Sequence, residues 1–356
     1  IYQVTLTFTK SQTIETRGDM TINSIPIWLD CDPGHDDAIA MLISCFHPAF
    51  KLLGLGASYG NAPSENTSYN ARSLITAFGK TQDVPIYPSA KRPWVFEPEY
   101  APDVHGASGL DGTTLLPVPE CEMIIEKSYL DAMEEAIITH NGEITLVSTG
   151  ALTSVATLLR DRPHLKKMVR YISIMGGGID LGNRNDNHSA EFNIWIDPQA
   201  ANFILSDPDI KNKCILLPLN VTHKAIADQR VQDQIRGNGQ SKLRELFYEL
   251  FKFFEHCYKD AQGFDYPPTH DPLTLMPLLQ FYGWVNPSVL QLTYRRLNLH
   301  AIEDRNSPDL GKTCILKEHN SQEDLGTIVC FDMNIGFFWE QVFQALDRAA
   351  KSSTIE

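Results

Sequence analysis

The stretch "WLDCDPGHDDAIA", residues 28–40, places four aspartates within eight consecutive positions. Asp30, Asp32, Asp36 and Asp37 share this window with one histidine and with no lysine or arginine. Carboxylates this close repel one another, and their pKa values rise unless a positive charge lies among them. Either these side chains reach into water, or a cation from outside the chain balances them.

The four aspartates fall where a predicted strand gives way to a predicted helix. "IPIWLD" (25–30) is typical of a buried strand, and "DDAIAMLISCFH" (36–47) of a helix with an apolar face. Asp36 and Asp37 in the first helical turn are explained by the helix dipole, but Asp30 at the end of a buried strand is not. Ligands of parallel α/β sheets bind outside the carboxyl ends of the strands. A hard divalent cation, calcium or magnesium, would reconcile the four carboxylates.

Strand-like and helix-like segments alternate along most of the chain. This alternation predicts the α/β class, as a single domain with a mainly parallel central sheet flanked by helices. Residues 25–356 are expected to form this domain, and residues 1–24 a disordered extension outside it. The further predicted strands are 51–60, 84–90, 143–150, 170–178, 214–222, 290–299, 313–318 and 326–332, and the further predicted helices are 64–80, 151–162, 198–207, 241–262, 271–282 and 337–351.

Composition narrows the class of partner. Acidic residues outnumber basic ones 44 to 30, and a net charge of -14 disfavours nucleic acid and anionic membranes as partners. No apolar run approaches a membrane span in length. The seven cysteines are scattered without a CxxC pair, so neither a disulfide framework nor a zinc ribbon is expected. We therefore expect a small-molecule ligand and a reducing compartment, the cytoplasm or the nucleus.

The acidic motif resembles the DxDxxxDD signature of the inosine-uridine-preferring nucleoside hydrolases. Five further motifs follow in family order: "GN" (60–61), "VHGASGLDG" (104–112), "LVSTGALTSVA" (146–156), "MGGG…GN…SAEFNIWIDP" (175–198) and "HDP" (270–272). The resemblance covers about residues 25–350. It implies one α/β domain that cleaves the N-glycosidic bond of ribonucleosides, giving ribose and a free base. It further implies tightly bound Ca2+, uridine as the expected preferred substrate, and a homodimer or homotetramer.

The resemblance also assigns roles around the cation. Asp32 would bind the metal and act as the general base on the attacking water. Asp37 and Asp271 would complete the carboxylate ligands, and Thr149 would contribute its backbone carbonyl. Asp30 would orient the water and the ligands from behind them.

The same resemblance assigns the residues that contact the nucleoside. Asp36 would accept a hydrogen bond from the ribose 2′-hydroxyl. The expected leaving-group acid is His270, with His105 as the alternative, since histidine titrates near neutral pH. Tyr258 would stack on the base, and Met175 would either touch the ribose or fill the core. The other polar groups expected around the ribose are Asn61, Asn183, Glu191 and Asn193.

Two other functions fit part of the pattern. "DCDPG" fits a haloacid-dehalogenase-type phosphohydrolase, in which a DxD after the first strand supplies the nucleophile, but that mechanism leaves Asp36 and Asp37 without a role. A non-catalytic nucleoside-binding protein would need the metal and ribose contacts but no base beside the water position. Release of inorganic phosphate would identify the first, and binding of uridine without ribose release the second.

Overall fold

The computed structural model describes residues 23–356. The predicted disordered extension lies, for residues 1–22, outside the described residues. Residues 23 and 24 are exposed and precede the first strand. The backbone carbonyl of Asn23 accepts a hydrogen bond from the Trp284 indole at 3.3 Å. The division of the chain at residue 24 therefore stays a prediction.

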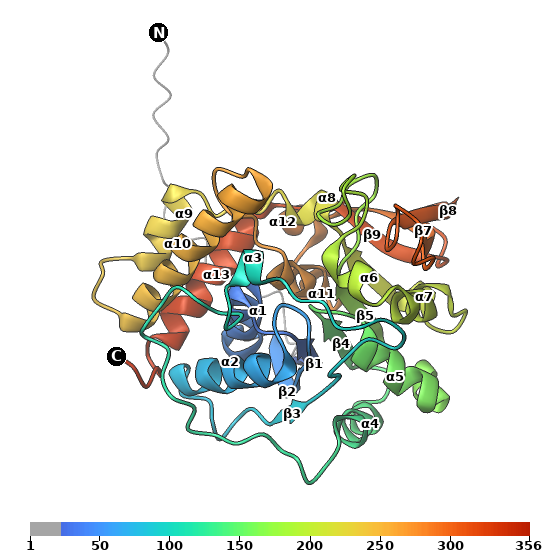
Figure 1. The fold of residues 1–356 in the computed structure, drawn as a ribbon. Helices are drawn as coiled ribbons and strands as arrows, with labels where there is room; N and C mark the ends of the chain where they lie inside the picture. Colours follow the sequence, from blue (N-terminus) through green and yellow to red (C-terminus); the bar gives the residue numbers. More distant parts are fainter. Residues whose placement is uncertain (1–22) are drawn as a thin grey trace.

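A mainly parallel sheet forms the centre of the protein, as predicted (Figure 1). Its strand order is β3-β2-β1-β4-β5-β6-β9-β7-β8. All neighbouring strands are parallel except that β7 runs antiparallel to both β8 and β9. The strands are β1 (Ile25–Cys31), β2 (Phe50–Ala57), β3 (Ile86–Pro88), β4 (Thr145–Ser148), β5 (Tyr171–Met175), β6 (Cys214–Leu217), β7 (Thr293–Ala301), β8 (Thr313–His319) and β9 (Thr327–Asp332).

Helices cover both faces of this sheet (Figure 1). The α-helices are α1 (His35–Phe46), α2 (Ser64–Ala77), α3 (Pro102–His105), α4 (Tyr129–Thr139), α5 (Thr153–Asp161), α6 (Phe192–Ile196), α7 (Pro198–Ser206), α8 (Leu219–Thr222), α9 (Gln229–Arg236), α10 (Lys242–Gln262), α11 (Met276–Phe281), α12 (Pro287–Leu290) and α13 (Ile335–Ala349). Three 3-10 turns accompany them: η1 (Pro163–Lys167), η2 (Lys211–Lys213) and η3 (Asp271–Leu275).

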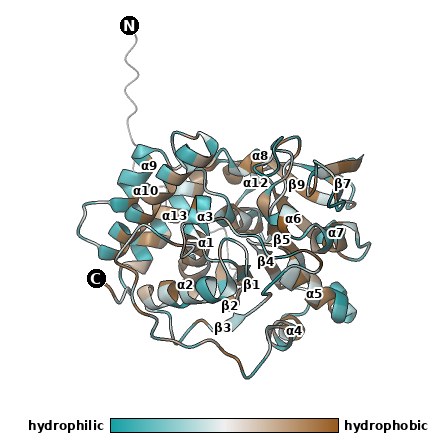
Figure 2. Ribbon diagram, in the orientation of Figure 1, coloured by the Kyte–Doolittle hydropathy of each residue, from teal (hydrophilic) through white to brown (hydrophobic). Residues whose placement is uncertain are grey.

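Alternate side chains of one strand pack into two different hydrophobic cores. Ile27 and Leu29 of β1 join the core that includes α1, α10 and α13, whereas Trp28 between them joins the core that includes α4, α5 and α7. This follows from the two-residue period of a strand. Helix α10 presents an apolar stripe to the first core, and Figure 2 shows hydrophobic and hydrophilic residues alternating along it. Both faces of the sheet are therefore covered, and its open sites lie at the strand ends.

The main departures from the predicted elements are two helices that were not predicted from the sequence, α4 and α9, and two predicted segments with other bounds. The strand predicted at 214–222 ends at Leu217, and helix α8 follows Pro218, which has no backbone N–H to extend a ladder. The helix predicted at 271–282 begins as the 3-10 turn η3 and becomes α-helical only at Met276. Within residues 23–356, no helix is both long enough and apolar enough to cross a membrane.

Candidate active site

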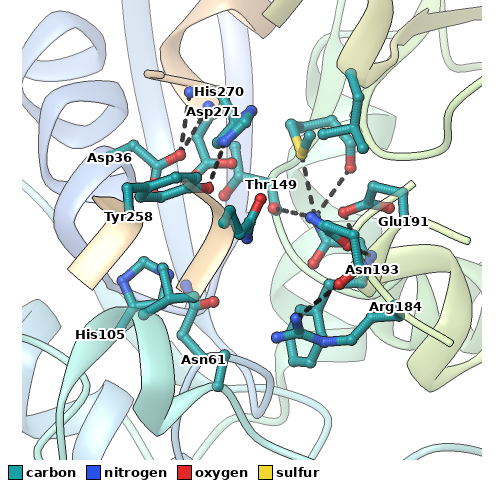
Figure 3. Close-up of a pocket in the computed structure, with 17 residues that line it drawn as sticks. Asp36, Asn61, His105, Thr149, Arg184, Glu191, Asn193, Tyr258, His270 and Asp271 are labelled. Atoms are coloured by element: carbon teal, nitrogen blue, oxygen red, sulfur yellow. Dashed lines mark hydrogen bonds between the residues drawn. The ribbon is translucent and has the colours of Figure 1, made fainter. Parts of the chain in front are cut away.

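A polar pocket of about 450 Å³ lies beyond the carboxyl ends of the parallel strands (Figure 3). It collects side chains from segments far apart in the sequence, including the α1 N-terminus, α3, α6, α10 and η3. The lining residues are Asp36, Asn61, Ala101, Val104, His105, Thr149, Met175, Asn183, Arg184, Glu191, Phe192, Asn193, Leu219, Tyr258, Gln262, His270 and Asp271.

Asp32 lies under this pocket, and the two residues that flank its carboxylate, Gly60 and Gly150, are glycines. Its Oδ2 accepts a hydrogen bond from the Asn61 backbone N–H at 2.7 Å, while its Oδ1 is buried and has no partner within residues 23–356. A Cβ atom at Gly60 would lie 2.1 Å from Oδ2, and one at Gly150 would lie 2.5 Å from Oδ1. Both distances are far below van der Waals contact, so glycine at these positions fixes where the carboxylate can lie. An unpartnered buried oxygen held this firmly is suited to bind a cation or a water.

Substitution of Gly150 by alanine should move the Asp32 carboxylate. Gly150→Ala is expected to lower turnover by about 10²-fold, because displacing a reacting group by about 1 Å can have an effect of that size. The matched control is Gly336→Ala in α13, where the new Cβ would have no neighbour closer than 3.3 Å. Steady-state kinetics on both variants, with circular dichroism to verify the fold, measures the difference. Equal turnover in both would mean that the position of Asp32 does not matter.

Three further carboxylates converge beside Asp32. One oxygen from each of Asp36, Asp37 and Asp271 lies within 4.8 Å of the others, and all three residues are buried. The Asp37 oxygens accept hydrogen bonds from the Thr149 hydroxyl at 2.7 Å and from the Asn61 amide at 3.0 Å. Asp36 Oδ2 accepts one from the His270 backbone N–H at 3.1 Å. These donors orient the carboxylates but do not neutralise them.

The electrostatics of this cluster fit a divalent cation. Burial and then Asp37 raise the pKa of Asp32 well above its usual range, and burial and then Asp36 raise the pKa of Asp37 to about 6. None of the ion pairs within residues 23–356 involves these carboxylates. Oxygen donors without a cationic side chain are the ligand set that calcium and magnesium bind in proteins. This cluster can therefore hold a metal ion.

The opposite wall of the pocket is built on the N-terminus of α6. Glu191 caps this helix, and its carboxylate accepts hydrogen bonds from the Gly177, Asn193 and Ile194 backbone N–H groups at 2.8, 2.9 and 3.2 Å. Burial nevertheless raises the pKa of Glu191 to about 7. The Asn193 amide donates to the Thr149 carbonyl at 2.8 Å, which ties this wall to the carboxylate cluster (Figure 3).

A chain of hydrogen bonds runs through His270. Its Nδ1 lies 2.7 Å from the Thr222 hydroxyl, and its Nε2 lies 2.7 Å from the Tyr258 hydroxyl. Burial lowers the pKa of His270 to about 3, so the neutral imidazole prevails near pH 7. His105, at the end of α3, lies 3.1 Å from His35, nitrogen to nitrogen. Burial and then His35 hold the pKa of His105 well below its usual value.

The sequence matches known proteins over most of its length. The sequence model of the inosine-uridine preferring nucleoside hydrolases matches residues 27–340. The chain belongs to this family. It is 60% identical to the uridine nucleosidase of Saccharomyces cerevisiae over 94% of this chain and 100% of the yeast protein. It is 34% identical to the pyrimidine-specific ribonucleoside hydrolase RihA of Photobacterium profundum, over 87% of this chain and 95% of the bacterial one.

Solved structures of nucleoside hydrolases share the fold. The plant nucleoside hydrolase PpNRh1 superposes with a TM-score of 0.77 at 25% identity, over 91% of this chain and 99% of the plant one. The purine-preferring ribonucleoside hydrolase from Gardnerella vaginalis gives 0.79 at 21% identity, over 92% and 99%. The predicted family and fold are thus confirmed, and the protein is a hydrolase of ribonucleoside N-glycosidic bonds. This nucleoside hydrolase is therefore neither a phosphohydrolase nor a non-catalytic binding protein.

Most residues predicted for the nucleoside hydrolase site lie together. The pocket lining includes Asp36, Asn61, His105, Thr149, Met175, Asn183, Glu191, Asn193, Tyr258, His270 and Asp271, and Asp32 and Asp37 lie directly behind it. The Asp30 side chain does not line it: Oδ1 accepts a hydrogen bond from the Ser89 hydroxyl at 2.8 Å, away from the pocket. Its backbone carbonyl instead accepts from the Thr149 N–H at 3.0 Å.

Several pocket residues were not predicted from the sequence. Thr222 holds His270, and Arg184, Phe192, Leu219 and Gln262 line the cavity. Arg184 carried one signal: it directly follows the predicted ribose contact Asn183 in the motif "GNRNDNHSAEFN". Phe192 lies between the predicted contacts Glu191 and Asn193 of the same motif. The other three, Thr222, Leu219 and Gln262, look like ordinary core or surface positions, and only the tertiary structure brings them to the site.

Proposed function

We propose that this nucleoside hydrolase cleaves uridine to ribose and uracil, using a calcium ion and Asp32 as the general base. The preference for uridine is supported by the 60% identity to a uridine nucleosidase and by the pyrimidine-specific relative. The observation that carries the mechanism is the Asp32 carboxylate, which is buried beneath the pocket with one oxygen free of protein partners. Ribose release from uridine, cytidine, inosine and adenosine tests the proposal, and uridine is expected to be the best substrate.

Asp32 would remove a proton from the attacking water. A general base must lie within hydrogen-bond reach of that water, and Oδ1 has no competing partner in the part of the chain that the structure describes. The Asn61 N–H on Oδ2 and the two flanking glycines hold the carboxylate in one orientation. Cleavage passes through an oxocarbenium-like state, which the surrounding carboxylates stabilise by their negative charge.

The proposed calcium ligands are Asp32, Asp37, Asp271 and the Thr149 carbonyl. Calcium accepts six to eight oxygens, including carboxylates and backbone carbonyls in flexible geometry, and this set offers both kinds. A bound calcium ion would supply the positive charge that lowers the pKa of the attacking water and draws in the ribose hydroxyls. Asp30 would orient the ligands and the water from behind them, because its backbone carbonyl accepts from the Thr149 N–H and its buried Oδ2 has no partner within residues 23–356.

Removal of the metal should lower both activity and stability. An ion bound only by the folded protein stabilises it by about 2.7 kcal/mol at a free concentration 100 times its Kd. Exhaustive chelation is therefore expected to lower the Tm by several degrees and to abolish turnover, and calcium should restore both. Differential scanning calorimetry and a ribose assay on the same samples measure this. A protein found metal-free by elemental analysis and still fully active would contradict the cation proposal.

The polar walls suggest how the ribose is held. Asp36 would accept from the 2′-hydroxyl, since its Oδ2 already bonds the backbone of His270 and leaves Oδ1 for the ligand. Asn61, Asn183, Glu191 and Asn193 offer further donors and acceptors, and Met175 lies beside Asn193. All of these groups line the pocket, and Figure 3 shows Asn61, Glu191 and Asn193 around the cavity that Asp36 and Asp271 also line.

The histidines and Tyr258 are proposed to serve the departing base. Tyr258 contributes its hydroxyl to the chain that runs through His270 to Thr222, so a proton can move along this chain to a base nitrogen. His105 lies on α3 on the other side of the base position, beside Val104.

The expected homodimer or homotetramer and the cytoplasmic or nuclear location remain proposals. Light scattering after size-exclusion chromatography measures the oligomeric state.

A further inference from the structure

Arg184 brings a permanent positive charge into an otherwise acidic pocket. Among the lining residues it is the one lysine or arginine, and it shares the lining with the acidic residues Asp36, Glu191 and Asp271. It lies in the loop between β5 and α6, and Figure 3 shows it on the wall opposite Asp36 and Asp271. Nothing in the proposed mechanism uses this charge.

The loop that carries Arg184 is anchored on both sides. Asn185 adopts the left-handed conformation, with φ 66°, and its amide donates to the Leu310 carbonyl at 2.8 Å. The Trp195 indole donates to the Asn185 side chain at 3.1 Å. A short antiparallel bridge joins Arg184 to Ala190. The backbone of Arg184 is therefore fixed relative to the pocket.

Most N–H donors of the Arg184 guanidinium have no hydrogen-bond partner within residues 23–356. Nη1 donates to the Asn183 carbonyl at 3.0 Å, and the group lies over the Phe192 ring at 4.7 Å. The nearest carboxylate, Asp103 on α3, is 3.7 Å from Nη2, which is too long for a hydrogen bond. One of five N–H donors is thus engaged within residues 23–356. The side chain is only 16% exposed, and it lines the pocket.

The charge of Arg184 influences the pKa values of two pocket residues, Glu191 and His105. Burial raises the pKa of Glu191, and Arg184 opposes that rise. Burial and then the neighbouring histidines lower the pKa of His105, and Arg184 lowers it further. The contact of Arg184 with Phe192 of α6 and its 3.7 Å approach to Asp103 of α3 place the guanidinium between these two elements. With the ribose on the carboxylate cluster, the base extends into the space between these walls.

We propose that Arg184 determines base specificity by donating hydrogen bonds to an exocyclic carbonyl oxygen of the base. This role rests on the proposed ribonucleoside hydrolysis and extends it to a substrate class: keto bases such as uracil are selected over amino bases such as cytosine. Arginine has donors and no acceptor, so it pairs with the uracil carbonyl at position 4 and leaves the cytosine amino group without a partner.

The other polar residues at this end of the pocket do not discriminate in this way. Gln262 has an amide that can present either its oxygen or its nitrogen, and the Tyr258 hydroxyl and the His270 ring can each donate or accept. They adapt to a keto or an amino group by rotation or by exchange of a proton. A guanidinium has no such freedom, which makes Arg184 the discriminating group.

The test compares uridine with cytidine in three proteins. In the native enzyme kcat/KM should favour uridine over cytidine by about tenfold or more, since one well-made contact to a base edge gives discrimination of that order. Arg184→Ala should lower this ratio by about tenfold, chiefly through a loss on uridine. The matched control is Arg160→Ala, which removes an arginine stacked on Trp94 at 4.5 Å outside the pocket and should leave the ratio unchanged.

A third variant keeps the test decisive if Arg184→Ala does not fold. The side chain of Arg184→Gln is shorter than arginine but remains a polar group beside Phe192. Its amide can present a carbonyl oxygen, so this variant should accept cytidine relatively better than the native enzyme does. An unchanged uridine-to-cytidine ratio in either folded variant, or equal losses on both substrates, overturns the role of Arg184. A native enzyme that releases ribose from neither nucleoside overturns the proposed function itself, and this role with it.

Discussion

Replacement of Asp32 by asparagine is expected to lower kcat by at least about 10³-fold while the fold is kept. General-base catalysis contributes about 10²- to 10⁴-fold, and this substitution also removes one carboxylate from the cation site. Asparagine has nearly the same shape, and its carbonyl can still accept from the Asn61 N–H. Because Asp32 is buried beside Asp37, the loss of its charge also relieves repulsion in the metal-free protein. Stability without metal should therefore not fall.

A matched control separates the loss of a base from the loss of a buried charge. Asp197 is also fully buried, but it caps α7 and accepts from the Thr153 hydroxyl at 2.6 Å, outside the pocket. Asp197→Asn should lower the Tm and keep kcat, the opposite of Asp32→Asn. Kinetics and thermal unfolding of both variants, each with its metal content measured, provide the comparison. Near-native turnover in folded, metal-loaded Asp32→Asn would remove Asp32 from the mechanism.

The second large effect concerns the sugar. 2′-Deoxyuridine should be cleaved about 10⁴-fold more slowly than uridine, because a site built to bond a hydroxyl rejects the analogue that lacks it. The missing hydroxyl leaves Asp36 unpaired in a buried site, where an unsatisfied polar group costs about 1–3 kcal/mol and a charged one more. Much of the loss should appear in kcat if the contact tightens in the transition state.

The Asp36→Asn variant tests whether Asp36 recognises the 2′-hydroxyl of the ribose. Its carbonyl can still accept from the His270 N–H, but the amide nitrogen would face the sugar as a donor. The uridine-to-deoxyuridine ratio should shrink by about tenfold or more, through damage to uridine. The ratio should be unchanged in Asp197→Asn. Equal rates on uridine and deoxyuridine in the native enzyme would mean that neither Asp36 nor the cation contacts the 2′-hydroxyl.

The elements with the strongest local patterns were predicted correctly, whereas the helices α4 and α9 were not predicted. The apolar run of β1 and the three-to-four spacing of α10 each determine one element, and both appear within one or two residues of the predicted bounds. The carboxylate cluster was predictable for the same reason, since most of it lies in one strand–turn–helix unit. Asp271 was predicted only from the family motif, because it lies more than 200 residues after Asp37 in the sequence.

The remainder depends on tertiary contacts. Strand β6 ends just before Pro218, because the chain turns there into α8 at the pocket. The sequence itself remains apolar beyond this point, so it predicts a longer strand. The side chain of Asp30 lies in the same acidic motif as Asp32 but bonds Ser89 instead of the site, which the alternation of a strand alone does not reveal. Arg184 enters the pocket because its loop is anchored to Leu310, more than 120 residues away.

The most direct test of the account is product analysis of uridine turnover in phosphate-free, calcium-containing buffer. Proton NMR of the reaction should show ribose and uracil appearing in equal amounts, at a rate that added phosphate does not change. That result would follow from water as the nucleophile beside Asp32. Ribose 1-phosphate formed only when phosphate is supplied, or no cleavage of uridine by folded, calcium-loaded enzyme, would contradict the account.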